Sequence, residues 1–459
     1  MPLFHADFSF SRGACHRSRR SFTIKTPLQL TIEKLVYGGD GLARLPADAH
    51  GPGKTVFLPF VLPGEKVEAE LLEDKRSFAR GRAEKLLQVS PQRVAPPCPC
   101  FQRCGGCHYQ HANYEHQLEI KAAILKENLR RLAKIELDAE LQIHASPPWN
   151  YRNRTRLKVQ TAPEFALGYY KFNSHDLLPV EQCPISSPLI NRAITALWQL
   201  GRSGRIANQV QEIEVFADSA DARLLVELCC APDVVRASAI QLAEEVKSAL
   251  PEAAGVVVFT SLLATHSPAE PREVAAAGER ELTYKVGSQS YRVSAGAFFQ
   301  ANRHLTEELV KIVAGSASGG TALDLYAGGG LFSTALAKSF AQVVAVEPSP
   351  ISFSDLSYNS FGNVKTVRVT TEQFLKNHAA GLKPDLLVVD PPRTGLRESV
   401  VCELARLSSP RLTYVSCDPA TLSRDLAGLL AAGYRIEQAH LVDLFPQTFH
   451  LESVFQLAR

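Results

Sequence analysis

A cysteine and a glutamate near the C-terminus have the chemistry for covalent catalysis. Cys417 follows the apolar run 412–415, which predicts a buried strand, and Asp418-Pro419 then begins a turn or a helix. The free amides of a helix start can stabilise a thiolate, the nucleophilic form of cysteine. A lone cysteine in such a place is usually a packing residue. Glu452 precedes the last apolar run, however, and a carboxylate on the same sheet edge as a thiol is a candidate base.

A glycine-rich turn followed by an acid indicates a nucleoside-binding sheet. The residues from Asp324 to Gly330, in the order Asp-Leu-Tyr-Ala-Gly-Gly-Gly, separate a predicted strand from a predicted helix, and Glu347 closes the next strand. Glycines let the backbone turn sharply and approach a ligand, while a helix start presents free amides to it. An acid at the end of the second strand binds ribose hydroxyls in such sheets. A dinucleotide fold is an alternative, but the opening acid, the single Gly-x-Gly and the absence of a further glycine between it and the helix favour an S-adenosylmethionine fold.

A third motif, Asp390-Pro-Pro-Arg393, ends another apolar strand. Open α/β sheets bind ligands at the carboxyl ends of their strands. The prolines stiffen the backbone, so the Asp390 carboxylate is held for a ring or an amine. A capped turn from strand to loop is the structural alternative. Some enzymes that methylate the amino groups of adenine or cytosine carry a similar acid-Pro-Pro element, so the motif alone also allows amino methylation.

Ten cysteines occur in the chain, and four of them fall within ten residues. In a chain without a secretory signal, such a group indicates a metal or redox centre rather than disulfides. The predicted ligands are three cysteines of residues 98–107, the cysteine loop, and one in a later Gln-Cys-Pro turn: Cys98, Cys104, Cys107 and Cys183. Cys100 is a competitor for the fourth position. An iron–sulfur cluster and a zinc ion are both compatible with this spacing. With zinc, a ligand could come from one of three neighbours: Cys100, His108 or His111.

The charge is divided unevenly along the 459 residues. Residues 1–160 hold 25 Lys+Arg against 16 Asp+Glu, a net charge of +9, whereas the remaining residues carry −6. This asymmetry predicts a basic front that meets a polyanion. No stretch approaches the roughly 18 apolar residues of a membrane span, and the N-terminus lacks the apolar core of a secretory signal. We therefore expect a cytoplasmic protein that acts without a membrane, and no protein partner is indicated.

Basic side chains also alternate within one short segment. Four cations occupy every second position: Arg152, Arg154, Arg156 and Lys158. On a strand these side chains share one face, which could follow the phosphates of a nucleic acid. A solvated strand face is the equally weighted alternative.

Hydrophobic periodicity divides the chain into four parts. The composition of residues 1–21 predicts a basic, flexible extension, and the short alternating runs of 22–88 predict a small β-barrel. Residues 89–292 carry the cysteine loop and a mixed α+β domain. Residues 293–459 alternate strands with helices, which predicts a doubly wound, mostly parallel sheet.

A helix is predicted over 114–132 and is expected to pack on the C-terminal domain. Its apolar face would be formed by Leu118, Ala122, Leu125 and Leu129. Its cations, Lys121 among them, would lie on the other faces.

These motifs together resemble the RNA 5-methyluridine (uracil-C5) methyltransferase family, in its iron–sulfur type that begins with a TRAM domain. The match runs from about residue 22 to the C-terminus and includes the segment Phe299-Gln300-Ala-Asn302. The resemblance implies a class I S-adenosylmethionine-dependent methyltransferase. Its Rossmann-like doubly wound sheet would follow an N-terminal TRAM/OB-type β-barrel and a mixed α+β central domain.

The same resemblance implies a role for each site residue. Four side chains would contact S-adenosyl-L-methionine: Gln300, Tyr326, Glu347 and Asp390. The four cysteines would hold a [4Fe-4S] cluster: Cys98, Cys104, Cys107 and Cys183. Cys417 would be the nucleophile and Glu452 the proton acceptor.

The chemistry of uracil explains why a thiol and a base are needed together. C5 is too weak a nucleophile to take a methyl group until a thiolate adds at C6 and turns the ring into an enolate. A base must then remove the C5 proton so that the thiol can leave. The uridine must also leave its stack to reach the sheet edge.

RNA is therefore the expected partner, with ribosomal RNA favoured and transfer RNA as the second choice. Two other functions stay open at this point. One is an amino methyltransferase that uses Asp390-Pro-Pro-Arg393, and the other is a non-catalytic RNA-binding protein with an iron–sulfur or zinc centre.

Overall fold

The computed structural model describes residues 28–47, 53–260 and 272–459. The predicted extension 1–21 lies outside the described residues. Internal contacts divide the chain into two compact units, Met1–Arg93 and Val94–Arg459. The finer boundary expected between residues 292 and 293 stays a prediction. Within the described residues, no helix has the length and the apolar character to span a membrane.

The first unit is a curled, mostly antiparallel sheet. Its strands, in the described residues, are β1 (Leu28–Thr31), β2 (Lys34–Leu35), β3 (Asp40–Arg44), β4 (Thr55–Pro59), β5 (Lys66–Asp74) and β6 (Phe78–Gln88). They are ordered β1-β5-β6-β4-β3-β2. Register shifts between β5 and β6 curl the sheet, because each extra residue increases the local twist. Alternate side chains of β4, Val56 and Leu58, are fully buried in the core that this curvature closes.

The second unit contains a central mixed sheet. Its described strands are β8 (Arg154–Gln160), β9 (Ala166–Tyr170), β10 (Leu177–Pro179), β11 (Val210–Ala217), β12 (Leu224–Cys230), β13 (Ala253–Thr260) and β14 (Arg272–Gly278). They are ordered β10-β9-β8-β11-β12-β13-β14, and β12 and β13 run parallel. Two amphipathic helices, α2 (Pro188–Arg202) and α3 (Arg236–Ala249), pack their apolar faces on this sheet.

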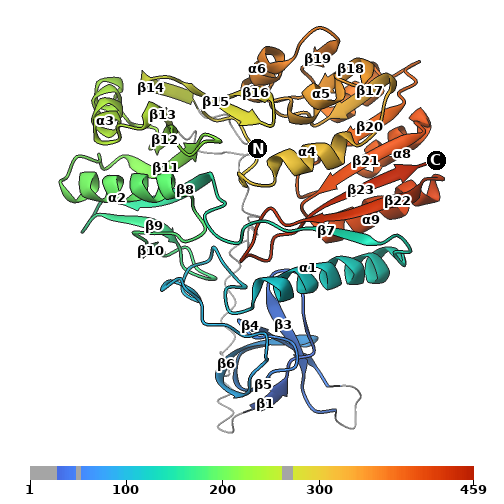
Figure 1. The fold of residues 1–459 in the computed structure, drawn as a ribbon. Coiled ribbons are helices and arrows are strands. Elements are labelled where there is room, and N and C mark those ends of the chain that lie inside the picture. The colour runs from blue at the N-terminus through green and yellow to red at the C-terminus, as the bar shows by residue number, and fades with distance from the viewer. Residues whose placement is uncertain (1–27, 48–52, 261–271) are drawn as a thin grey trace, which may run out of the picture. The chain divides into compact units, whose positions relative to one another are not determined.

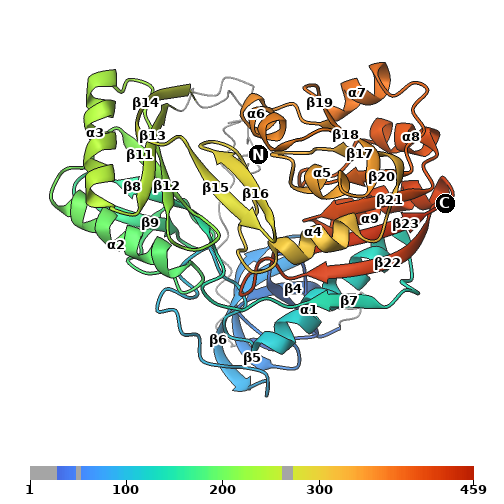
Figure 2. The ribbon, with the colours of Figure 1, turned by 45° about the horizontal axis from the view of Figure 1, so that its top comes forward.

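A hairpin lies between this sheet and the C-terminal sheet (Figures 1 and 2). It consists of β15 (Glu281–Val286) and β16 (Gln289–Ser294). Its buried rings, Tyr284 and Tyr291, pack against Phe299. One hydrophobic core therefore extends across the hairpin from the central sheet to the C-terminal sheet.

The C-terminal sheet is a doubly wound sheet of eight described strands. They are β7 (Leu141–His144), β17 (Gly319–Leu325), β18 (Phe340–Val346), β19 (Val364–Val367), β20 (Leu386–Val389), β21 (Arg411–Ser416), β22 (Arg435–Val442) and β23 (Glu452–Ala458). Their order is β19-β18-β17-β20-β21-β23-β22-β7, and β23 runs antiparallel to both of its neighbours. The apolar, fully buried β20 is typical of a parallel strand covered on both faces.

Helices precede or connect these strands (Figure 1). They are α4 (Thr306–Ala314), α5 (Leu331–Leu336), α6 (Pro350–Asn359), α7 (Thr371–Asn377), α8 (Glu398–Leu407) and α9 (Pro419–Ala431). The strand order reverses at β17, with β18 and β19 on one side and β20 and β21 on the other. Ligands of doubly wound sheets bind at the carboxyl ends of the strands beside such a switch point.

The helix predicted after the cysteine loop is present but buries a different face. It consists of α1 (Tyr114–Asn128) and a π-helical turn, η1 (Leu129–Ala133). Two of the four predicted apolar positions are only half-buried, whereas Gln117 and Lys121 are buried. The prediction that Lys121 lies on an outer face is wrong, because its ammonium group pairs with the buried carboxylate of Asp443.

Candidate active site

The predicted site residues that follow four strands converge on one edge of the C-terminal sheet. Tyr326 follows β17, Glu347 follows β18, Asp390 follows β20 and Cys417 follows β21. The last residues of β17, β18 and β20 pair with one another, so these three strands end level. The four side chains therefore gather at the carboxyl edge beside the switch point.

Glu347 is tied to the glycine turn. Its Oε2 accepts the N–H of Gly328 and its Oε1 accepts the N–H of Ser349, both at 2.9 Å. Burial raises the pKa of Glu347, and the two N–H donors oppose that rise. Each carboxylate oxygen has a second lone pair. The group is thus fixed in orientation and can still accept hydrogen bonds from a diol.

The start of the glycine turn is buried and constrained. Asp324 accepts a hydrogen bond from the Ser333 hydroxyl at 2.5 Å, and its Oδ1 has no hydrogen-bond partner among the described residues. Burial raises the pKa of Asp324 to about 7 and that of Tyr326 to about 12. Tyr326 has a φ of 69°, in the left-handed region that bulky residues rarely adopt. Backbone strain of this kind concentrates at functional turns.

Gln300 lies in the segment between β16 and α4. Its side chain is buried. The segment is anchored by Asn302, whose amide donates to the Leu444 carbonyl and to the Ser146 hydroxyl, both at 3.0 Å. The segment that carries Gln300 therefore contacts the connection between β22 and β23, which leads to Glu452.

Cys417 and Glu452 are brought together by the antiparallel pairing of β21 with β23. Ser416, the last residue of β21, lies opposite Ser453. Cys417 and Glu452 are the next residues outward on the two strands. This pairing therefore brings the predicted nucleophile and the predicted base to the same edge.

The surroundings of Cys417 keep the thiol protonated in the resting protein. Burial raises the pKa of the thiol, and the charges of Glu452 and Asp390 raise it further. Arg393 is the nearby cation that opposes this rise. The thiol must therefore lose its proton in a setting that resists ionisation.

The first amides of α9 are used by Asp418 and are not left open to this thiol. The Asp418 carboxylate accepts the N–H of Ala420 at 3.0 Å and that of Thr421 at 2.9 Å. Pro419, the first helical residue, has no N–H to offer. The expectation that the helix start stabilises the Cys417 thiolate is wrong, because an N-cap side chain already uses these donors.

Glu452, which is buried, and Asp390, which is partly buried, are two carboxyl groups close enough to influence one another. Burial raises the pKa of Glu452 well above its ordinary value, and the Asp390 charge adds to that rise. Burial and the charge of Asp324 raise the pKa of Asp390 to about 7. A carboxylate with a raised pKa takes up a proton readily near neutral pH, as a general base must.

Arg393 and His450 complete this edge, although the sequence motifs assign them no role. The Arg393 guanidinium donates to Nδ1 of His450 at 3.0 Å. Burial lowers the pKa of His450 and the Arg393 charge lowers it further, so the ring is neutral and can accept this bond. The sequence indicates Arg393 and His450 only by their position, because each lies within three residues of a predicted site residue.

The four predicted metal-binding cysteines lie close enough to influence one another. Burial raises the pKa of Cys104 to about 12, and the charges of Cys183 and Cys98 add to the rise. The pKa of Cys107 is raised by burial and then by the charges of the other three. The Gly106 N–H donates to Sγ of Cys104 at 3.4 Å. Buried, mutually repelling thiols of this kind need a positive centre before they ionise.

A set of four thiols fits an iron–sulfur cluster, whose sulfurs also accept N–H hydrogen bonds. Within the described residues, no group of three or more His, Cys, Asp or Glu side chains is spaced for a single metal ion. The iron–sulfur cluster and the alternative zinc ion both stay predictions.

The alternating cations of β8 do not form an open phosphate-binding stripe. They lie beside acids of β11, where Glu214 is opposite Arg156 and Glu212 is opposite Lys158, and each pair forms a salt bridge. Arg154 is largely buried and also pairs with Glu214. The predicted stripe is wrong for these three cations, because acids of the neighbouring strand pair with them. Arg152 lies outside β8, and its Nε donates to the Arg154 carbonyl.

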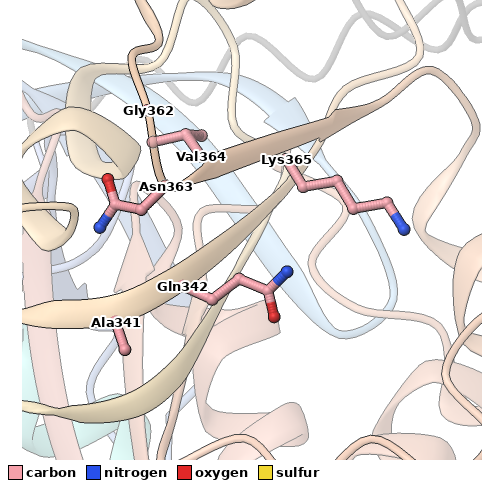
Figure 3. A pocket seen from close by; sticks show the side chains of 6 residues that line it. All are labelled: Ala341, Gln342, Gly362, Asn363, Val364 and Lys365. Atoms are coloured by element: carbon pink, nitrogen blue, oxygen red, sulfur yellow. The ribbon is translucent and has the colours of Figure 1, made fainter.

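A shallow hollow of about 250 Å³ lies away from this edge (Figure 3). It is lined by Ala341, Gln342, Gly362, Asn363, Val364 and Lys365. These residues lie at the amino ends of β18 and β19, whereas the site residues follow the carboxyl ends. The lining has no thiol and no carboxylate, so the hollow is not the candidate active site.

Two family models match the chain. Residues 113–459 match the family described as tRNA (Uracil-5-)-methyltransferase. Residues 26–83 match the TRAM domain. The first match covers most of the chain.

Two relatives are similar over nearly their whole length. An uncharacterized RNA methyltransferase of Aquifex aeolicus is 33% identical over 93% of this chain and 97% of its own. The 23S rRNA (uracil(1939)-C(5))-methyltransferase RlmD of Yersinia enterocolitica is 32% identical over 95% of this chain and 96% of its own.

A solved structure has the same fold. It is the Pyrococcus abyssi tRNA (uracil-54, C5)-methyltransferase in complex with S-adenosyl-L-homocysteine, with a TM-score of 0.73 and 22% identity. The similarity covers 94% of this chain and 100% of that one. The predicted fold class is confirmed: a TRAM barrel, a mixed central domain and a Rossmann-like sheet.

Proposed function

Because the chain belongs to the tRNA (uracil-5-)-methyltransferase family, and is thus an S-adenosylmethionine-dependent RNA (uracil-C5)-methyltransferase, we propose a specific reaction for it. It methylates C5 of one uridine in 23S ribosomal RNA, with Cys417 as the nucleophile and Glu452 as the proton acceptor. The observation that carries this proposal is the pairing of Ser416 with Ser453. Cys417 and Glu452 each lie one residue beyond this pair, at the same edge of the sheet.

The proposed reaction has three steps. The deprotonated sulfur of Cys417 bonds to C6 of uracil, and the electrons of the C5–C6 double bond move toward C5 and O4. C5 then attacks the electrophilic methyl group that S-adenosyl-L-methionine would supply when bound; the S–CH3 bond breaks and its electrons stay on sulfur, which leaves S-adenosyl-L-homocysteine. Glu452 then takes the C5 proton, the C5–C6 double bond re-forms, and the C6–S bond breaks to return the thiolate.

The charges at this edge suit that order of steps. The raised pKa of Glu452 favours uptake of the C5 proton. Arg393 offsets the negative charge of the carboxyl groups around Cys417, and it is available to offset the charge that the ring carries after thiolate attack.

S-Adenosyl-L-methionine is assigned to the switch point of the sheet. Glu347 would accept the ribose hydroxyls with the lone pairs that Gly328 and Ser349 leave open. Tyr326, Gln300 and Asp390 would supply the other contacts. The support for this assignment is the strained glycine turn, where the backbone can approach a ligand closely.

A [4Fe-4S] cluster is assigned to the four cysteines of the second unit: Cys98, Cys104, Cys107 and Cys183. The support is that the four thiols lie close enough to raise one another's pKa, together with the N–H donor to Cys104. The four thiolates would fill the coordination of the cluster, so its role is structural rather than catalytic.

Ribosomal RNA is the proposed substrate because the chain is similar over almost its whole length to a 23S rRNA uracil methyltransferase. The TRAM domain would bind a part of the RNA other than the target uridine. RNA mass spectrometry on a deletion strain tests this proposal. Loss of one 5-methyluridine from 23S RNA supports it, and loss from transfer RNA alone would show that the substrate assignment is wrong.

The catalytic proposal is tested with RNA that carries 5-fluorouridine at the target. Fluorine at C5 cannot leave as a proton, so a Cys417 nucleophile is trapped as a covalent enzyme–RNA adduct that survives denaturing electrophoresis. Cys417→Ala should form no adduct and transfer no methyl group to uridine RNA. Methyl transfer by this variant would refute the proposal.

A further inference from the structure

The connection between β22 and β23 is held in place by residues that lie before β17 in the chain. It runs from residue 443 to residue 451 and leads directly to Glu452. Four consecutive carbonyl groups in it accept hydrogen bonds of 2.8 to 3.0 Å: Leu444 from Asn302, Phe445 from Lys121, Pro446 from Tyr151, and Gln447 from the N–H groups of His108 and Tyr109. Surface connections usually have far fewer such contacts.

Lys121 of α1 makes a charged attachment to this connection. Its Nζ lies 2.5 Å from Oδ1 of Asp443 and 2.9 Å from the Phe445 carbonyl oxygen. The lysine and aspartate side chains are 1% and 0% exposed. The Tyr114 hydroxyl donates to the other Asp443 oxygen at 2.9 Å. A buried ion pair with its hydrogen bonds completed favours one arrangement of the chain around it.

Gln117, one turn before Lys121, makes a reciprocal pair with Gln447. Its Nε2 donates to Oε1 of Gln447, and its Oε1 accepts the Gln447 N–H, both at 3.0 Å. Gln447 has a φ of 68°, in the left-handed region. Such a backbone conformation is unfavourable for a residue other than glycine and persists only where its surroundings enforce it. The Gln117 amide and the N–H groups of His108 and Tyr109 supply that enforcement.

The cysteine loop is part of the same attachment. His108 and Tyr109 directly follow Cys107, and both of their N–H groups donate to the Gln447 carbonyl. The His108 ring packs edge-on against Phe449, with the ring centres 4.6 Å apart. The loop that carries three of the predicted cluster ligands therefore contacts the connection at two places.

The attachment begins one residue from the strand partner of Glu452. Val442, the last residue of β22, pairs with Glu452, and Asp443 follows it directly. The end pairs of a strand ladder open easily unless the chain beyond them is ordered. The position of the Glu452 carboxylate at the sheet edge thus depends on how firmly Lys121 and its neighbours hold the connection.

We propose that Lys121, Gln117 and Tyr151 are positioning residues for Glu452, so that α1 and the cysteine loop control proton removal from C5. They act after the Cys417 thiolate has attacked, because Cys417 is carried by β21 and α9 rather than by this connection. This inference rests on the proposed role of Glu452 as the proton acceptor. It predicts a defect confined to the last step of the reaction.

Two substrates separate that step from the earlier ones. Adduct formation with 5-fluorouridine RNA requires attack and methyl transfer but no proton removal, whereas turnover on uridine RNA requires all three. Lys121→Met and Gln117→Leu should lower single-turnover product release on uridine RNA by about tenfold or more. The covalent intermediate should accumulate, while the rate of 5-fluorouridine adduct formation stays within about twofold of the unmodified enzyme. Lys126→Met, at an exposed position of the same helix, is the matched control and should change neither rate.

Tyr151→Phe provides a second test in case Lys121→Met or Gln117→Leu does not fold, because it removes one hydroxyl and keeps the ring. It should show the same confined defect at smaller size. Equal loss of both rates in the folded variants, or loss of neither, would overturn the inference. Glu452→Gln is the reference variant. If Glu452→Gln does not accumulate the covalent intermediate, the proposed base is wrong. If Glu452→Gln accumulates the intermediate and the three positioning variants do not, only the positioning role is wrong.

Discussion

The Arg393 guanidinium donates to Nδ1 of His450 at 3.0 Å and so joins the loop after β20 to the loop before β23. The contact holds one cation near the Cys417 thiol, whose pKa is raised by burial and by two carboxyl groups. The reactivity of the thiol is therefore a balance between nearby acids and this arginine.

The first prediction concerns the pH dependence of the thiol. Because the pKa of Cys417 in the folded protein is raised, the thiolate fraction is small at pH 7 and grows about tenfold per pH unit as the pH approaches that pKa. The rate of Cys417 alkylation by iodoacetamide, followed by peptide mass spectrometry, should still be rising at pH 9. A plateau below pH 8 would contradict the raised pKa.

Arg393→Met should shift that profile to higher pH. Removing this guanidinium takes away a positive charge that opposes the effect of Glu452 and Asp390 on the thiol. We expect alkylation and adduct formation at pH 7.5 to slow by about tenfold, which corresponds to about one pH unit. Arg397→Met is the control, because its side chain is 80% exposed and lies on the same loop. A profile that Arg393→Met leaves unmoved would exclude this role for the arginine.

Glu347→Gln should weaken binding of S-adenosyl-L-homocysteine by about tenfold, the effect of roughly one charge-assisted hydrogen bond. The amide keeps one acceptor oxygen, but its NH₂ group cannot accept the N–H of Gly328 or of Ser349. Isothermal titration calorimetry measures the change. Glu398→Gln, at the exposed start of α8, should leave the affinity unchanged. Unchanged affinity in Glu347→Gln would show that this acid does not face the ribose.

The predicted cluster gives a test with a matched pair of cysteines. Protein purified without oxygen should be brown and contain about four iron and four sulfide ions per chain. Cys107→Ser should lose the colour and the iron, since Cys107 is a proposed ligand. Cys100→Ser should keep both, although Cys100 lies in the same loop. Colourless protein that contains zinc would refute the cluster.

Glu227 gives a prediction about stability rather than activity. Burial and then the Glu214 charge raise its pKa from 4.5 to about 7. The folded state therefore holds this proton more tightly than the unfolded state, and the stabilisation is present below pH 4.5 and lost as the pH rises to about 7. The loss is at most about 3 kcal/mol.

Glu227→Gln removes this dependence. The melting temperature of the variant, relative to that of the unmodified protein, should rise between pH 5 and pH 8. Glu279→Gln, whose carboxylate is 53% exposed, should show no such change. A difference between Glu227→Gln and the unmodified protein that is equal at both pH values would contradict the buried ionisation.

The sheet edge could be predicted from the sequence because its signals are local. An apolar run followed by a polar residue marks the end of a strand, so Tyr326, Glu347, Asp390 and Cys417 were all expected at one edge. The glycine turn can be predicted in the same way, since few residues other than glycine adopt its backbone conformation.

The partners of charged residues could not be predicted in this way. The spacing along the helix predicts an outer face for Lys121. Its partner Asp443 is far away in the chain, so the helix sequence cannot indicate this buried ion pair. The cations of β8 were expected to be open to phosphates, yet Glu212 and Glu214 of the adjacent strand neutralise them. The helix amides near Cys417 were expected to be open too, although Asp418 caps them.

The sequence by itself determined which residues have the chemistry for the reaction and at which strand ends they stand, because strand period, glycine turns and residue type are properties of short segments. Only the tertiary structure decided which of those groups are buried, paired or held in position. Burial and pairing depend on which distant segments become neighbours, and it is the meeting of α1 with the connection before β23 that sets Glu452 within reach of its proposed task.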